Sequence, residues 1–99
     1  MQATDATRQL RVLIVEDDVN RWKRIERAVL EALPGAAIQW ASDAESARLA
    51  LESCWFDAVI ADYMLEDDTN GWTLRSECHR LQPQARVTSC AAFVGELSA

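Results

Sequence analysis

The sequence predicts an α/β domain built on a parallel sheet. Short β-branched or apolar runs alternate along the chain with amphipathic segments of helical period. The expected order is strand, helix, strand, helix, strand, helix, strand, which is typical of a right-handed parallel sheet with helices on its faces. The chain has 99 residues, 49% of them hydrophobic, so it suits one small globular domain and excludes a disordered tail.

The first strand is expected at residues 11–15, "RVLIV", because an uninterrupted apolar run suits a strand buried on both faces. A helix follows in "RWKRIERAVLEAL" and ends at the breaker pair Pro34-Gly35. Its apolar stripe consists of Trp22, Ile25, Val29 and Leu33. A second short strand is expected at 37–41, "AIQWA".

The second helix is expected at about residues 43–53. Ser42 and Glu45 have the spacing of a capping box, which predicts that this helix begins after Ser42. The third strand is expected at 55–62, "WFDAVIAD", another run whose apolar residues suit a buried strand.

The last two elements are a third helix and a fourth strand. The helix is expected at 71–81, "GWTLRSECHRL", and is followed by Pro83. The strand is expected at 85–91, "ARVTSCA", and is the weakest of the four because Thr88 and Ser89 interrupt its apolar character.

Composition narrows the classes of function. The net charge of −6 makes nucleic acid an unexpected partner, and no run approaches the roughly 18 apolar residues of a membrane span. Residues 1–9 lack the apolar core of a signal peptide and are expected to be a disordered leader to a domain at 10–99. The three cysteines, Cys54, Cys78 and Cys90, lack metal-binding spacing and indicate reduced thiols in a cytoplasmic protein.

Two acidic clusters follow strands. Glu16, Asp17 and Asp18 follow the first strand, and Asp62 closes the third, ahead of a second acidic run at 66–68. Ligands of parallel α/β sheets bind at the carboxyl ends of the strands, so the two clusters would converge if their strands are neighbours. Carboxylates held close together repel one another unless they are protonated or bound to a cation.

The chemistry that fits these acids is magnesium binding and phosphoryl transfer. Oxygen ligands suit Mg²⁺, and a carboxylate beside it can attack phosphorus and form an aspartyl phosphate. Phosphatases of the haloacid-dehalogenase type would need a second aspartate two residues after Asp62, where Met64 stands. The simpler alternative remains open: Glu16, Asp17 and Asp18 could only favour a helix N-terminus, and Asp62 could only cap a loop.

Three motifs, "RVLIVEDD", "FDAVIADYML" and "NGWTL", resemble in order and spacing the receiver domain of two-component response regulators. The resemblance covers about residues 10–99. It implies a flavodoxin-like parallel sheet with strand order 2-1-3-4 and three helices. A whole receiver has five strands and five helices, so the resemblance implies a chain truncated at its C-terminal side.

The resemblance also implies the roles of individual residues. Asp62 matches the phosphoacceptor, which receives phosphate from a histidine kinase or phosphotransfer protein in a phosphorelay. The family's Mg²⁺ would be bound here by Glu16, Asp17, Asp62 and the main-chain carbonyl of Met64. Asp17 is the expected direct ligand and Glu16 the water-mediated one, whereas Asp18 is expected to be a solvated acid at the helix start.

The sequence departs from the family pattern in three places. Glu66 stands where the family often has proline, and Ala91 and Ala92 stand where it has a hydroxyl residue and a small one. A shift of two residues would put Ser89 in the hydroxyl role. The sole lysine, Lys23, matches nothing like the family's phosphate-binding lysine.

These departures keep a second function open, a phosphorylation-independent interaction module with a receiver fold. No independent enzyme is expected, and His79 is expected to be an exposed helix residue. The fourth strand would form an open edge, which predicts a homodimer or swapped assembly. The tryptophans are expected at the core or its rim: Trp22, Trp40, Trp55 and Trp72.

Overall fold

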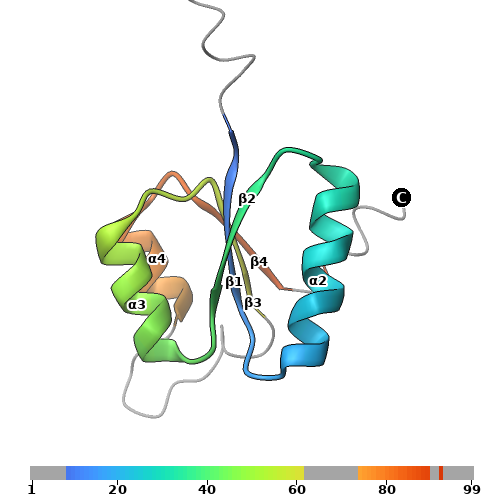
Figure 1. Ribbon diagram of the computed structural model, residues 1–99. Coiled ribbons are helices and arrows are strands. Elements are labelled where there is room, and N and C mark those ends of the chain that lie inside the picture. The colour runs from blue at the N-terminus through green and yellow to red at the C-terminus, as the bar shows by residue number, and fades with distance from the viewer. Residues whose placement is uncertain (1–8, 62–73, 90–91, 93–99) are drawn as a thin grey trace, which may run out of the picture.

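The computed structural model describes residues 9–61, 74–89 and 92. The elements are β1 (Arg11–Val15), α2 (Val19–Ala32), β2 (Ala37–Ala41), α3 (Ala44–Ser53), β3 (Ala58–Ala61), α4 (Leu74–Leu81) and β4 (Arg86–Ser89). The four strands form one parallel sheet in the order β2-β1-β3-β4 (Figure 1). The predicted flavodoxin-like fold, with strand order 2-1-3-4 and three helices, is confirmed. Residues 1–8 of the expected leader lie outside the described part of the chain.

Helices cover both faces of the sheet. Figure 1 shows α2 on one side and α3 with α4 on the other. The central strands β1 and β3 contribute to both layers because successive side chains of a strand point to opposite faces. The last four residues of β1 and the last three of β3 are buried, which confirms the prediction that an unbroken apolar run marks a strand covered on both faces.

The core has two parts. The larger lies between the sheet and the helices α3 and α4, and its buried residues include Leu13, Val59, Leu51, Leu74 and Cys78. The smaller lies under α2 and consists of Val12, Ile14, Ile25, Val29 and Ile60, with Trp22 and Leu33 packed against it. The predicted apolar stripe of the first helix is therefore confirmed, since all four of its residues belong to this smaller part of the core or pack against it.

The start of α3 differs from the prediction by one residue. The N-cap is Asp43, not Ser42: Asp43 Oδ1 accepts a hydrogen bond of 2.8 Å from the Ser46 main-chain N–H. The Ser46 hydroxyl in turn accepts from the Asp43 N–H at 3.2 Å, which completes a capping box. A carboxylate accepts more strongly than a hydroxyl, so Asp43 takes the capping role from its neighbour.

The third strand is shorter than predicted, because β3 begins at Ala58 and not at residue 55. The two aromatic residues before it differ in burial: Phe56 is buried, whereas Trp55 is 56% exposed. The Phe56 main-chain N–H donates to the side-chain oxygen of Gln82 at 2.8 Å, so it does not take part in a strand ladder. Gln82 is itself buried and also donates to the carbonyls of Leu51 and Cys54.

The fourth strand is confirmed over residues 86–89, and the third helix over residues 74–81. The fourth strand begins at Arg86, one residue later than predicted, and the predicted extensions at 71–73 and 90–91 lie outside the described residues. Within the part of the chain that is described, no helix is both long enough and apolar enough to cross a membrane.

Candidate functional site

The candidate site lies where β1 ends and α2 begins. In the sheet Val15, the last residue of β1, pairs with Ala41 of β2 on one side and with Ala61 of β3 on the other. The first and third strands are therefore neighbours, which is the condition on which the two acidic clusters were expected to converge. Glu16 and Asp17 are described by the structure, whereas Asp62, Met64 and the acidic run 66–68 lie outside the described residues.

The main chain of Glu16 is fixed to the second strand by two hydrogen bonds. Its N–H donates to the carbonyl of Ala41 at 2.9 Å, which extends the β1–β2 ladder by one residue. Its carbonyl accepts from the indole N–H of Trp40 at 2.6 Å. Trp40 also packs against Trp22 of α2, with 5.2 Å between ring centroids. The turn that carries the acidic pair is thus held rigidly against the sheet.

The Glu16 side chain is buried, with 2% of its surface exposed, and a buried carboxylate needs partners. Its Oε2 atom accepts from the main-chain N–H of Asp18 at 3.1 Å and from Nε of Arg21 at 3.1 Å. Asp17 is different: its side chain is 60% exposed, and its Oδ1 lies 3.8 Å from Nη2 of Arg21. One guanidinium therefore contacts both members of the acidic pair.

Arg21 is a residue of the candidate site that was not predicted from the sequence. It lies four residues after Asp17 and five after Glu16, and this spacing was available as a signal. A basic residue in the first turn of a helix is unfavourable toward the helix dipole unless acids lie beside it. That combination indicates an arginine directed toward the acidic pair.

Asp18 caps the helix and is not part of the pair, as predicted. Its Oδ1 accepts from the main-chain N–H groups of Asn20 at 2.8 Å and Arg21 at 3.3 Å. These hydrogen bonds, with that from Arg21 the stronger cause, lower the pKa of the Asp18 carboxyl below its ordinary value. The cap fixes the first turn of α2 and hence the position of Arg21.

The residues at the other end of the site are only partly described. Ala61, which precedes Asp62 in the sequence, pairs with Ser89 at the end of β4. The Ser89 hydroxyl accepts from the main-chain N–H of Ala92 at 3.1 Å. Ser89 therefore lies at the carboxyl ends of the strands, where the alternative alignment needs a hydroxyl residue. Ala91, which the preferred alignment puts at that position, lies outside the described residues.

The carboxylates of Glu16 and Asp17 are of the ligand type that a hard divalent cation prefers. Glu16 and Asp17 offer only carboxylate oxygen, the ligand type that Mg²⁺ prefers, and Mg²⁺ commonly keeps several waters beside one or two carboxylates. No group of three or more potential metal-binding side chains occurs among the described residues, and Asp62, the third expected carboxylate, lies outside them. In this structure the positive charge next to the pair comes from Arg21.

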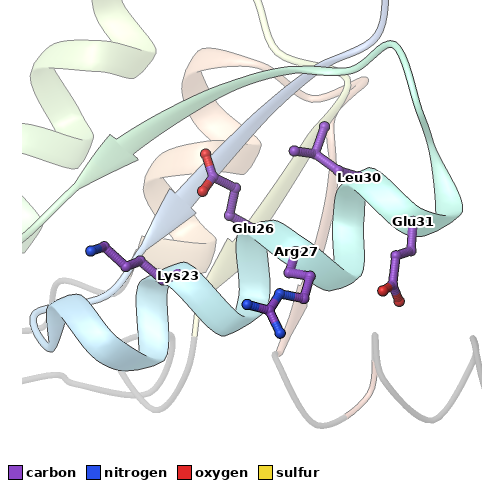
Figure 2. Close-up of a pocket in the computed structure, with 5 residues that line it drawn as sticks. All are labelled: Lys23, Glu26, Arg27, Leu30 and Glu31. Carbon is purple, nitrogen blue, oxygen red and sulfur yellow. The ribbon is translucent and has the colours of Figure 1, made fainter.

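A separate hollow of about 480 Å³ lies along α2 (Figure 2). Its lining residues all come from that one helix: Lys23, Glu26, Arg27, Leu30 and Glu31. Ligand sites are typically concave and mostly apolar, so this charged helical surface is a poor candidate for one. It also contains neither member of the acidic pair.

The remaining chemical candidates are accounted for by the fold. His79 is exposed on α4, as predicted. Cys54 and Cys78 are free thiols, and burial raises the pKa of Cys78 to about 11. Trp22 packs at the rim of the smaller core, as expected, and Trp40, which is 40% exposed, contacts it, whereas Trp55 is mostly exposed. Trp72 and Cys90 lie outside the described residues.

Comparison with solved structures identifies the fold. The chain superposes on the signal receiver domain of an HD domain-containing protein from Pseudomonas fluorescens Pf-5 with a TM-score of 0.67 and 26% identity. It is also similar to a CheY-like response regulator receiver domain protein from Methanospirillum hungatei JF-1, with a TM-score of 0.63 and 20% identity. Each match covers 83% of this chain and 63% of the other. The fold is that of a CheY-like receiver domain, which confirms the resemblance drawn from the sequence.

A third solved structure is similar, whereas the sequence comparisons found no match. An adenylate cyclase from Rhodopirellula baltica matches with a TM-score of 0.63 and 14% identity, over 83% of this chain and 58% of that protein. No protein-family model matches the sequence, and no curated protein is significantly similar to it. The chain spans about three fifths of the length of the solved structures that it matches.

Proposed function

We propose that the chain is a receiver-like phosphoacceptor domain of two-component signalling, in which Asp62 accepts a phosphoryl group from a histidine kinase or phosphotransfer protein. One observation carries the proposal. Val15 and Ala61 are register partners in the sheet, and they are the residues that immediately precede Glu16 and Asp62 in the sequence. The acidic pair thus begins directly beside the strand that leads to the proposed acceptor.

In the proposed reaction a carboxylate oxygen of Asp62 forms a bond to phosphorus. The phosphorus–nitrogen bond of the donor phosphohistidine breaks, and its electron pair stays on the imidazole nitrogen. Glu16, Asp17, Asp62 and the carbonyl of Met64 would hold Mg²⁺, which supplies positive charge to offset that on the transferred group. We propose no further substrate and no independent enzymatic activity for the chain.

The experiment that tests this proposal is intact-mass measurement after incubation with Mg²⁺ and a small phosphodonor such as acetyl phosphate. We expect one phosphoryl increment that requires Mg²⁺, is removed by Asp62→Asn and survives Asp68→Asn, a matched change in the same acidic stretch. An unmodified wild-type mass, or an increment that persists in Asp62→Asn, would refute the role of Asp62.

A second function is favoured by one specific observation. Arg21 already contacts both Glu16 and Asp17, and because its guanidinium stays charged at all ordinary pH values, it can balance the acidic pair without a metal ion. Under this alternative the chain is an interaction module whose binding surface does not depend on Mg²⁺ or phosphate. The same mass measurement separates the two, because the module would acquire no phosphoryl group at any Mg²⁺ concentration.

We also propose that the chain forms a homodimer or swapped assembly and works in the cytoplasm. Among the described strands β4 lies at one edge of the sheet, and its residues Val87, Thr88 and Ser89 are only half-buried. Unpaired main-chain groups at such an edge can add a strand from another copy. Light scattering after size-exclusion chromatography tests this: a dimer mass supports it, and a monomer mass at high concentration contradicts it.

A further inference from the structure

Arg21 joins two carboxylates that differ in their access to solvent. Its Nε lies 3.1 Å from Oε2 of Glu16, whose side chain is 2% exposed, and its Nη2 lies 3.8 Å from Oδ1 of Asp17, whose side chain is 60% exposed. The arginine side chain itself is 42% exposed, so it reaches from the solvent-accessible surface to the buried carboxylate of Glu16. A small cation bound to these same two oxygens, Glu16 Oε2 and Asp17 Oδ1, would take the place that the guanidinium now holds.

The local structure holds this arginine in place. Asp18 caps α2 through the main-chain N–H groups of Asn20 and Arg21, which puts Arg21 in the first helical turn. A positive charge there is opposed by the helix dipole, and the two acids offset that cost. Oε2 of Glu16 accepts from both the Asp18 N–H and the Arg21 Nε–H, so one carboxylate oxygen contacts the capping residue and the arginine together.

We propose that Arg21 is a built-in counter-ion that competes with a divalent cation for Glu16 and Asp17. This inference rests on the magnesium site of the proposed function and adds to it the residue that sets the affinity. Without metal, the guanidinium satisfies the buried carboxylate, which would otherwise be a costly unpaired charge. With metal, the guanidinium must leave the carboxylates, because two positive charges repel at such distances.

Two consequences distinguish this competition from a purely structural ion pair. Removal of the guanidinium should strengthen divalent-cation binding, since the metal no longer has to displace it. It should also make the thermal stability of the protein depend on metal, since Glu16 then has no other positive charge of this kind within the described contacts. A structural ion pair predicts lower stability with unchanged metal affinity.

The test is a titration of the unphosphorylated protein with Mn²⁺ alone, in which electron paramagnetic resonance measures the free ion. We expect Arg21→Gln to bind Mn²⁺ roughly tenfold more tightly than the wild type, as expected for the loss of one charged competitor. Arg27→Gln is the matched control: it removes the same charge from an exposed position of the same helix and should change the affinity less than twofold. Thermal melting should show that Mn²⁺ raises the Tm of Arg21→Gln more than it raises the Tm of the wild type or of Arg27→Gln.

The outcomes separate this inference from the proposed function. Equal affinity in the wild type and Arg21→Gln overturns the role of Arg21 but leaves the metal site, whereas no binding by any of the three proteins overturns both. Phosphorylation of Asp62 does not enter the measurement. If Arg21→Gln does not fold, Arg21→Lys takes its place. Lysine lacks the planar guanidinium that contacts both carboxylates, so Arg21→Lys should bind Mn²⁺ a few-fold more tightly than the wild type does. Unchanged binding by Arg21→Lys would then overturn the inference.

Discussion

The indole N–H of Trp40 donates a 2.6 Å hydrogen bond to the main-chain carbonyl of Glu16. This contact links the fourth residue of β2 to the first residue after β1, at the edge of the sheet where the acidic pair begins. Trp40 also packs against Trp22, so a single side chain ties the turn, the sheet and α2 together. The acidic pair is therefore held by contacts that do not involve its own carboxylates.

Replacement of Trp40 by phenylalanine should weaken this arrangement. Phenylalanine keeps an aromatic ring beside Trp22 but cannot donate to the Glu16 carbonyl. We expect Trp40→Phe to lower the free energy of unfolding by about 1 kcal/mol, the usual net contribution of one hydrogen bond. Urea denaturation measures the change, and Trp55→Phe, at an exposed position, should stay within about 0.5 kcal/mol of the wild type. Equal stability losses in the two variants would contradict this role for Trp40.

Gln82 should be the most sensitive polar residue of the core. It is 4% exposed, accepts from the Phe56 N–H and donates to the carbonyls of Leu51 and Cys54. Gln82→Leu leaves these main-chain groups without a partner, and we expect a loss of about 2–4 kcal/mol in the free energy of unfolding. Chemical denaturation of Gln39→Leu, an exposed change on β2, provides the control; a similar loss there would refute the bridging role of Gln82.

Asp43 should contribute to stability in a pH-dependent way. The Ser46 hydroxyl and, secondarily, the Ser46 main-chain N–H donate to its carboxylate and lower its pKa below the ordinary value of 3.8. A carboxyl with a lowered folded-state pKa stabilises the fold above pH 3.8 and loses that effect as pH falls through its folded value. Asp43→Asn still caps the helix but cannot titrate, so its stability should fall less steeply below pH 3.8.

Urea midpoints measured across this acidic range test the prediction. Ser42→Ala, one residue earlier, should keep the wild-type pH dependence, since Ser42 is not the cap. Parallel curves for the wild type and Asp43→Asn would show that the Asp43 carboxylate does not contribute in this way.

The thiol of Cys78 should react very slowly with alkylating reagents in the folded protein. Its side chain is fully buried in the larger core, and this desolvation raises the thiol pKa to about 11. At pH 8 only about 0.1% of such a thiol is ionised, and the thiolate is the form that reacts. Iodoacetamide should therefore label half-buried Cys54 before Cys78, and urea should abolish the difference. Peptide mapping measures both positions, and equal labelling rates in the native protein would contradict the burial of Cys78.

The sequence predicted the fold well because its apolar residues follow clear patterns. The unbroken run "RVLIV" is typical of a strand buried on both faces, and the stripe that contains Ile25 and Val29 is typical of a helix with one buried face; both were found. The strand order that the resemblance implied also predicted that the first and third strands, each followed by acidic residues, are neighbours. Errors arose where side chains compete for main-chain groups: Asp43 displaced Ser42 as the cap, and Gln82 took the Phe56 N–H from the expected strand.

The candidate site was predictable in composition but not in its contacts. Glu16 and Asp17 lie directly after β1 and Asp18 is the N-cap of α2, as the sequence indicated, whereas the role of the pair as metal ligands stays a prediction. The guanidinium of Arg21 was missed, because an arginine in a basic helix segment has many exposed alternatives that sequence alone does not exclude. The Trp40 contact was also out of reach, since it joins residues 24 positions apart through a side chain on a neighbouring strand.

The central claim is that the acidic pair and Asp62 form one divalent-cation site. Mn²⁺ titration of ¹⁵N-labelled protein, followed by NMR, tests it most directly because the ion broadens only the amide signals near it. We predict that the signals of residues 16–18 and 62–64 broaden together at the same low Mn²⁺ concentration, while those of α4 stay sharp. Broadening of one segment without the other, or of neither, would contradict the claim.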